Sequence, residues 1–114
     1  MNESILISVK SILGIEHDCD DFDSALKLFI NTALAFLRQL GVGPDDGFVV
    51  LGPTQTWEDL LGNDKRLEDV KAYVGLKVKT MFDPSASSVV TEAYNSQLKE
   101  LEWRINSVAD YEKE

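Results

Sequence analysis

The chain has 114 residues, 20 of them acidic and 11 basic, so its formal net charge is −9 with His17 neutral. At this length one hydrophobic core can form without covalent staples, and we expect a single domain over residues 1–114. Cys19 is the only cysteine, which excludes an intramolecular disulfide and a Cys-x-x-Cys motif. The acidic balance argues against a surface that wraps nucleic acid. No apolar run approaches the ~18 residues of a membrane-spanning helix and no cationic leader is present, so we expect a soluble, unprocessed protein.

Hydrophobic periodicity predicts an all-α fold built from a small bundle of four main helices. The first helix runs from about Glu3 to Leu13, and Gly14 can take the left-handed conformation that ends it. The second helix follows an acidic run and continues to Leu40, where Gly41 is a natural terminator. Its apolar residues extend well beyond the usual amphipathic stripe. We therefore expect it to be covered on two sides, either by its own fold or by another copy of the protein.

Residues 42–62 interrupt the helical pattern with several glycines and two prolines. We interpret this excursion as a long loop. The run Phe48–Leu51 has strand character, so a short β-ribbon or an extended arm is the alternative. Thr56, followed three residues later by Asp59, can cap a single helical turn. Loops of this length inside compact domains are usually functional or disordered, so we expect this one to be mobile in the monomer and ordered only by contact with a neighbour or the portal.

The third helix is predicted from about Asp64 to Phe82, after an Asn63 cap. Gly75 in its interior costs about 1 kcal/mol relative to Ala, which indicates close packing by another group.

The fourth helix begins between residues 84 and 88, and residues 109–114 form a frayed tail. The apolar residues of the fourth helix recur at alternating steps of four and three, which makes a heptad-like seam for packing against other helices. The seam consists of Val90, Tyr94, Leu98, Leu101, Ile105 and Val108.

The acidic run before the second helix holds His17 and Cys19 and invites a metal interpretation. An EF-hand loop that starts at Asp18 would require Gly and Glu where the chain has Asp23 and Phe29. Acids before a helix start more simply cap its free N–H groups and complement its dipole. A Ser or Cys nucleophile would have one histidine to serve as its base, and no glycine-rich phosphate loop is present. We therefore predict no enzymatic activity, no metal and no cofactor.

Three consecutive features make the second half of the chain recognisable. Tyr73–Pro84 is a Tyr-led helix that ends at Phe-Asp-Pro, Ser85–Ser88 is a Ser-containing linker, and Leu98–Asn106 closes the last helix with Glu-Trp-Arg. This pattern resembles the small head-tail connector proteins of tailed bacteriophages. The N-terminal plan extends the resemblance: a short helix ending in Gly-Ile, an acidic linker and a long apolar helix. It covers most of the chain and leaves out the excursion.

The resemblance implies a structural protein of the virion neck, made in the bacterial host cytoplasm. Many copies would form a ring between the portal and the tail or stopper, supporting head completion and tail attachment. DNA would pass through the channel without specific binding, because a negative lining repels phosphates. No reaction, cofactor or membrane is implied.

Several residues are candidates for contacts with another subunit or the portal. At 100° per residue, Trp103 lies about 160° to 200° from its nearest seam neighbours and must face away from the monomer core. Lys77 and Lys79 would meet acids of an adjacent subunit. The full candidate set is Trp103, Lys77, Lys79, Asp20, Asp21, Asp23, Trp57, Phe48 and Val50.

The competing interpretation is a small acidic regulatory or inhibitory module that binds one partner through its helical face. Mass in solution helps to separate the two, because a connector can assemble into a ring whereas a regulator is more often a monomer or dimer.

Overall fold

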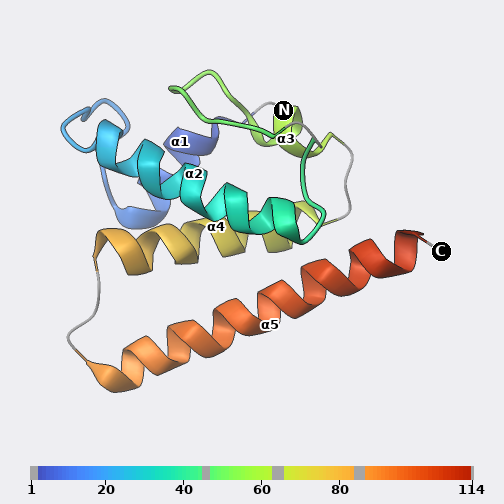
Figure 1. The fold of residues 1–114 in the computed structure, drawn as a ribbon. Coiled ribbons are helices and arrows are strands. Elements are labelled where there is room, and N and C mark those ends of the chain that lie inside the picture. The colour runs from blue at the N-terminus through green and yellow to red at the C-terminus, as the bar shows by residue number, and fades with distance from the viewer. Residues whose placement is uncertain (1–2, 45–46, 63–65, 84–86, 114) are drawn as a thin grey trace.

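The computed structural model describes residues 3–44, 47–62, 66–83 and 87–113, with side chains described as far as residue 106. Within these ranges the chain is all-helical and contains five helices (Figure 1). They are α1 (Ile5–Leu13), α2 (Asp23–Gln39), α3 (Trp57–Leu61), α4 (Leu67–Phe82) and α5 (Ser88–Lys113). The predicted all-α class is therefore confirmed, with the excursion carrying one short additional helix.

Helix α4 is the centre of the fold, because it contacts every other helix and lies between α2 and α5 (Figure 1). Its side chains Val70, Tyr73, Val74 and Val78 have no exposed surface. The core also includes apolar side chains from α1, α2, α3 and the middle of α5. Packing against a shared central helix stabilises α1, which at nine residues is too short to be stable alone.

The predicted ends of the first two helices are confirmed by their caps. Ser4 caps the N-terminus of α1, and its Oγ accepts from the Ile7 backbone N–H at 3.3 Å. Gly14 follows α1 with φ of 76°, the left-handed conformation that a residue without Cβ adopts at little cost. Helix α2 ends at Gln39, and Gly41 has a positive φ of 86°.

The capped turn predicted in the excursion is α3. The Thr56 Oγ1 accepts from the Asp59 backbone N–H at 3.0 Å, and the Asp59 carboxylate accepts from the Thr56 N–H at 3.0 Å. The alternative of a β-ribbon is wrong for the described residues. Their one isolated bridge joins Thr56 to Ser4, so the excursion pairs with the start of the chain instead of with itself.

The excursion also contributes to the monomer core, which corrects the expectation that a neighbour alone would order it. Val42, Val50, Trp57 and Leu60 are between 1% and 6% exposed. The Trp57 indole donates to the Ser8 Oγ at 3.0 Å, which satisfies its buried N–H group. These side chains find partners on α1 and α2 within the same chain.

Gly75 packs as predicted, because a Cβ at this position would lie 2.6 Å from Ile12 Cδ1. The glycine therefore allows α1 to approach α4 closely. Helix α4 begins at Leu67, later than predicted from the Asn63 cap, and residues 63–65 lie outside the described part.

Helix α5 begins at Ser88, within the predicted window, and its backbone continues to Lys113. The backbone of residues 109–113 continues this helix, and fraying of the predicted tail over residues 109–114 stays a prediction. The middle of the predicted seam is buried against α4: Leu98, Leu101 and Ile105 are at most 5% exposed. Val90 is 37% exposed, so the first turns of α5 are much less covered.

Candidate interaction surfaces

Trp103 lies on the outer side of α5 and is 69% exposed. Its seam neighbours Leu101 and Ile105 are buried on the opposite side, against α4. The predicted orientation of Trp103 is thus confirmed, although its role at an interface stays a prediction. An exposed indole of this size is a candidate anchor for a partner.

Two polar contacts fix the rotation of α5 and therefore the direction of Trp103. The buried Tyr73 hydroxyl donates to the Glu102 carboxylate at 3.2 Å. Burial raises the pKa of the Tyr73 phenol, and the nearby Glu102 charge raises this pKa further. Arg66 donates to the carbonyl of Ile105 at 3.5 Å and to that of Gly41 at 3.3 Å. It thereby links α5 to the end of α2.

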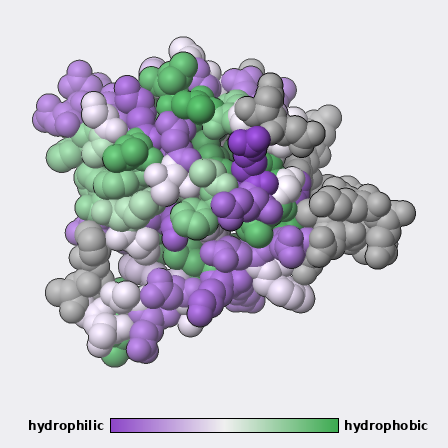
Figure 2. Space-filling view, in the orientation of Figure 1, coloured by the Kyte–Doolittle hydropathy of each residue, from purple (hydrophilic) through white to green (hydrophobic). Residues whose placement is uncertain are grey.

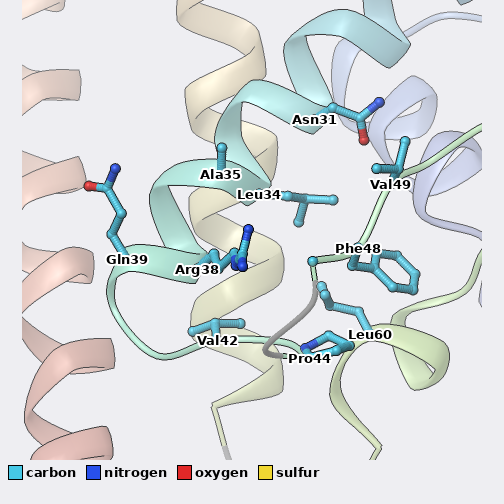
Figure 3. A pocket seen from close by; sticks show the side chains of 11 residues that line it. Asn31, Leu34, Ala35, Arg38, Gln39, Val42, Pro44, Phe48, Val49 and Leu60 are labelled. Atoms are coloured by element: carbon cyan, nitrogen blue, oxygen red, sulfur yellow. The ribbon is translucent and has the colours of Figure 1, made fainter.

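A groove of about 650 Å³ lies between the second half of α2 and the excursion (Figure 3). Its lining is mostly apolar and comprises Asn31, Leu34, Ala35, Arg38, Gln39, Val42, Pro44, Gly47, Phe48, Val49 and Leu60. Figure 3 shows Leu34 of α2 pointing across it toward Phe48 and Val49. The Asn31 side chain accepts from the Val50 N–H at 2.7 Å and donates to the Val50 carbonyl at 3.1 Å. This pair holds the far wall of the groove against α2.

The outer face of α2 is apolar over much of its length. Leu28 is 64% exposed, Phe22 43% and Phe36 45%. Figure 2 shows hydrophobic side chains gathered over the start of α2 and the end of α4, where Phe22 and Phe82 meet edge to face with centroids 5.3 Å apart. Within the described chain α2 packs on α4, α1 and the excursion and keeps an exposed apolar face. A cover for this face by another copy stays a prediction.

The two candidate lysines of α4 occupy different surroundings. The Lys77 ammonium lies 4.7 Å from the centroid of the Phe36 ring, a cation–π contact within the chain. Lys79 lines a second groove of about 410 Å³ between α4 and α5, whose lining also includes Asp69 and Arg104. The structure therefore does not gather the two lysines into one basic patch.

The candidate acids also divide into two groups. Asp20 and Asp21 are exposed in the loop between α1 and α2. Asp23 instead pairs with the buried Lys10, whose Nζ lies 2.7 Å from Asp23 Oδ1 and donates to the Cys19 carbonyl at 2.8 Å. This contact uses Asp23 within the monomer and makes it the weakest of the three acids as an interface residue.

The candidate residues of the excursion also differ in their surroundings; they are Phe48, Val50 and Trp57. Phe48 is half-buried and lines the large groove, whereas Val50 and Trp57 belong to the core. The side chains that face outward here are Val49 and Leu51, 55% and 72% exposed. Successive residues of an extended segment face opposite sides, so residues two apart face the same side. The sequence pattern could therefore have identified Val49 and Leu51 as an outward-facing pair.

The described side chains show no convergence of chemical groups of the kind that a metal site needs. No three His, Cys, Asp or Glu side chains among them come together. His17 is exposed and Cys19 is half-buried in the loop around Lys10. In the same described ranges, none of the helices combines the length and apolarity needed to cross a membrane.

Residues 5–112 match the protein family described as Phage connector protein. Comparisons with curated proteins and with solved structures gave no match. The family match spans nearly the whole chain, including the excursion and all five described helices. The chain therefore belongs to the phage connector protein family.

Proposed function

We propose that this protein is a structural subunit of the virion neck, where copies of the chain form a ring between the portal and the tail or stopper. The observation that carries the proposal is the family match over residues 5–112, which gives the chain a connector-type structural role. The ring would continue the DNA channel, support head completion and provide the surface for tail attachment. The protein would be made in the cytoplasm of the bacterial host.

The distribution of exposed apolar side chains supports self-association. Trp103 on α5 and the outer face of α2 around Leu28 lie on elements separated by α4. Soluble monomers seldom leave large apolar patches uncovered. Contacts that use two different faces of each copy are heterologous and can close into a ring.

The charge of the chain supports passage of DNA without specific binding. The net charge is −9, and exposed acids such as Asp20 and Asp21 crowd the loop between α1 and α2. A negative channel wall repels phosphates, so it would guide DNA without holding it. We also propose that the protein catalyses no reaction, since the connector family suggests a structural role.

The test is the mass of the full chain, alone and mixed with the portal protein of the same phage. We expect ring-shaped particles by electron microscopy and a mass equal to a whole number of subunits by native mass spectrometry. A chain that stays monomeric or dimeric at all concentrations and does not bind the portal would contradict the proposal. That outcome would favour the small acidic regulatory module instead.

A further inference from the structure

The segment 51–62, which includes α3, is organised by contacts of its own. The Gln55 Oε1 accepts from the backbone N–H groups of Leu51 at 2.8 Å and of Gly52 at 3.0 Å. The capping box of α3 closes the turn that follows. These contacts link the extended part of the segment to its helix, so we expect the two parts to move together.

Both ends of this segment are fixed by contacts outside it. On one side, the backbone of Val50 pairs with Asn31 of α2. On the other side, the buried Arg66 donates to backbone carbonyls at the end of α2 and in α5. Residues 51–62 can therefore leave the body of the fold, which is formed by α1, α2, α4 and α5, without separating these four helices.

Hydrogen bonds to residues 3–8 hold the segment on this body. Two backbone bonds of 3.1 Å each join it to the residues just before α1 and at its start. One of them runs from the Trp57 N–H to the Glu3 carbonyl. The Trp57 indole N–H donates to the Ser8 Oγ at 3.0 Å. Figure 1 shows the resulting position of α3, close to the N-terminus of the chain.

The Ser8 hydroxyl extends this contact toward the surface. Its Oγ lies 2.5 Å from Glu3 Oε1 and 2.7 Å from the Ser4 carbonyl. The Ser4 carbonyl already accepts the Ser8 backbone N–H at 2.9 Å, so the carboxylate is the stronger acceptor for the single hydroxyl hydrogen. This hydrogen bond is the main reason that the pKa of Glu3 is lowered from its ordinary value.

The Glu3 carboxylate also reaches α4, where it pairs with Lys71 at 3.4 Å. A chain of polar contacts thus runs from Trp57 through Ser8 and Glu3 to Lys71. Trp57 and Ser8 are buried, whereas the Glu3 side chain is 54% exposed. A change at the exposed carboxylate therefore acts on a buried indole N–H, which costs free energy when it loses its acceptor.

We propose that the contacts Trp57–Ser8–Glu3–Lys71 form a latch, and that its opening releases residues 51–62 from the body as one unit. Release exposes Trp57 and Leu60, which are the buried apolar side chains of the segment, while the four helices of the body stay packed. The inference rests on contacts within one chain. Its failure and the failure of the proposed ring are therefore separate results.

Amide exchange of the full chain at low urea concentrations tests whether the segment opens by itself. The Leu60 N–H donates within α3, and α3 has five residues, too few to be stable once it leaves the body. Val74 lies in the buried middle of α4. In the wild type we expect the Leu60 amide to exchange faster than the Val74 amide and to depend less on urea, because a smaller opening exposes less surface.

The latch itself is tested by cutting it in the middle. Glu3→Ala removes the acceptor of Ser8 and the partner of Lys71. Its control is Glu68→Ala, which removes the acid that lies 3.8 Å from Lys71 on α4. We expect the Leu60 amide to exchange at least roughly 10-fold faster in Glu3→Ala than in this control, the effect of losing a hydrogen bond to a charged group.

Two further variants separate a latch from independent contacts. Glu3→Gln keeps an oxygen that accepts from Ser8 and removes the charge, so its effect on the Leu60 amide should be smaller than that of Glu3→Ala. Ser8→Ala removes the link between the carboxylate and the indole. The double variant of Glu3→Ala and Ser8→Ala should accelerate exchange by much less than the product of the two single effects, because both changes break the same chain of contacts.

Three outcomes would overturn the inference. Leu60 and Val74 amides with one rate and one urea dependence in the wild type would show that residues 51–62 open only when the whole chain unfolds. Equal exchange in Glu3→Ala and Glu68→Ala would show that Glu3 contributes no more than a surface charge beside Lys71. Single effects that multiply in the double variant would show that Glu3 and Ser8 act separately.

Discussion

Lys10 and Asp23 form an ion pair across the junction of α1 and α2, with Nζ 2.7 Å from Oδ1. The Lys10 side chain is 4% exposed, and its ammonium also donates to the backbone of the intervening loop at the Cys19 carbonyl. A buried ammonium must satisfy its donors, so the acidic loop folds around it. The loop that contains the only histidine and the only cysteine is thus organised by a lysine from outside it.

Replacing Lys10 by Met should therefore destabilise the monomer strongly. The change keeps most of the apolar stem, removes the ammonium and leaves Asp23 without its partner. We expect a loss of about 3 kcal/mol in the free energy of unfolding, in the range measured when one member of a buried pair is removed. Urea unfolding followed by circular dichroism measures it. Lys27→Met on α2 is the control, and an equal effect of both changes would contradict this role of Lys10.

The structure also predicts how Gly75 responds to substitution. A methyl group at this position meets the flexible end of Ile12, which is 49% exposed and can rotate away. Alanine gains up to about 1 kcal/mol over glycine in a helix interior. Gly75→Ala should thus stabilise the chain more in an Ile12→Ala background than in the wild type. Thermal melts of the wild type, the two single variants and the double variant give the coupling between the two substitutions. A loss of stability on Gly75→Ala in both backgrounds would show that the backbone cannot accept the methyl group.

The features predicted correctly from the sequence are mostly local. The Thr56–Asp59 cap, the Gly14 terminator and the outward direction of Trp103 each depend on residues within one or two helical turns. The backbone of Val50 instead pairs with Asn31, 19 residues away, and no neighbouring residue signals this contact. Likewise, nothing in the pattern around Lys10 indicates that its ammonium lies inside. Contacts between distant segments decided both cases.

The buried Tyr73 hydroxyl should give the stability a measurable dependence on high pH. Its pKa is raised in the folded chain, so the unfolded chain ionises first, near the ordinary value of about 10. The contribution of the Tyr73–Glu102 contact is then fully present below pH about 10 and is lost as the pH rises further.

Tyr73→Phe removes both the contact and this dependence. We expect the substitution to cost about 1–2 kcal/mol at neutral pH, and the difference from the wild type to shrink above pH about 10. Urea unfolding of both chains at pH 7, 9 and 10.5 tests the sign. Subtracting the free energy of unfolding of Tyr73→Phe from that of the wild type cancels the titration of the other groups, which both chains share. A gap that is constant or widens with pH would show that Tyr73 ionises as readily in the folded chain as in the unfolded one.

Asn31 should control the order of the excursion. Its side chain forms hydrogen bonds with both backbone groups of Val50, at 2.7 and 3.1 Å, as a neighbouring strand would. Asn31→Ala leaves these groups unpaired beside a side chain that is 1% exposed, which should cost about 2 kcal/mol. We expect the amide of Val50 to exchange with solvent much faster in Asn31→Ala than in the wild type, whereas core amides of α4 such as Val74 change only as far as global stability falls. Gln39→Ala, which alters another lining residue of the groove without touching Val50, is the control and should leave the Val50 amide protected. If Val50 exchanged equally fast in the wild type, the excursion would be held by its buried side chains alone.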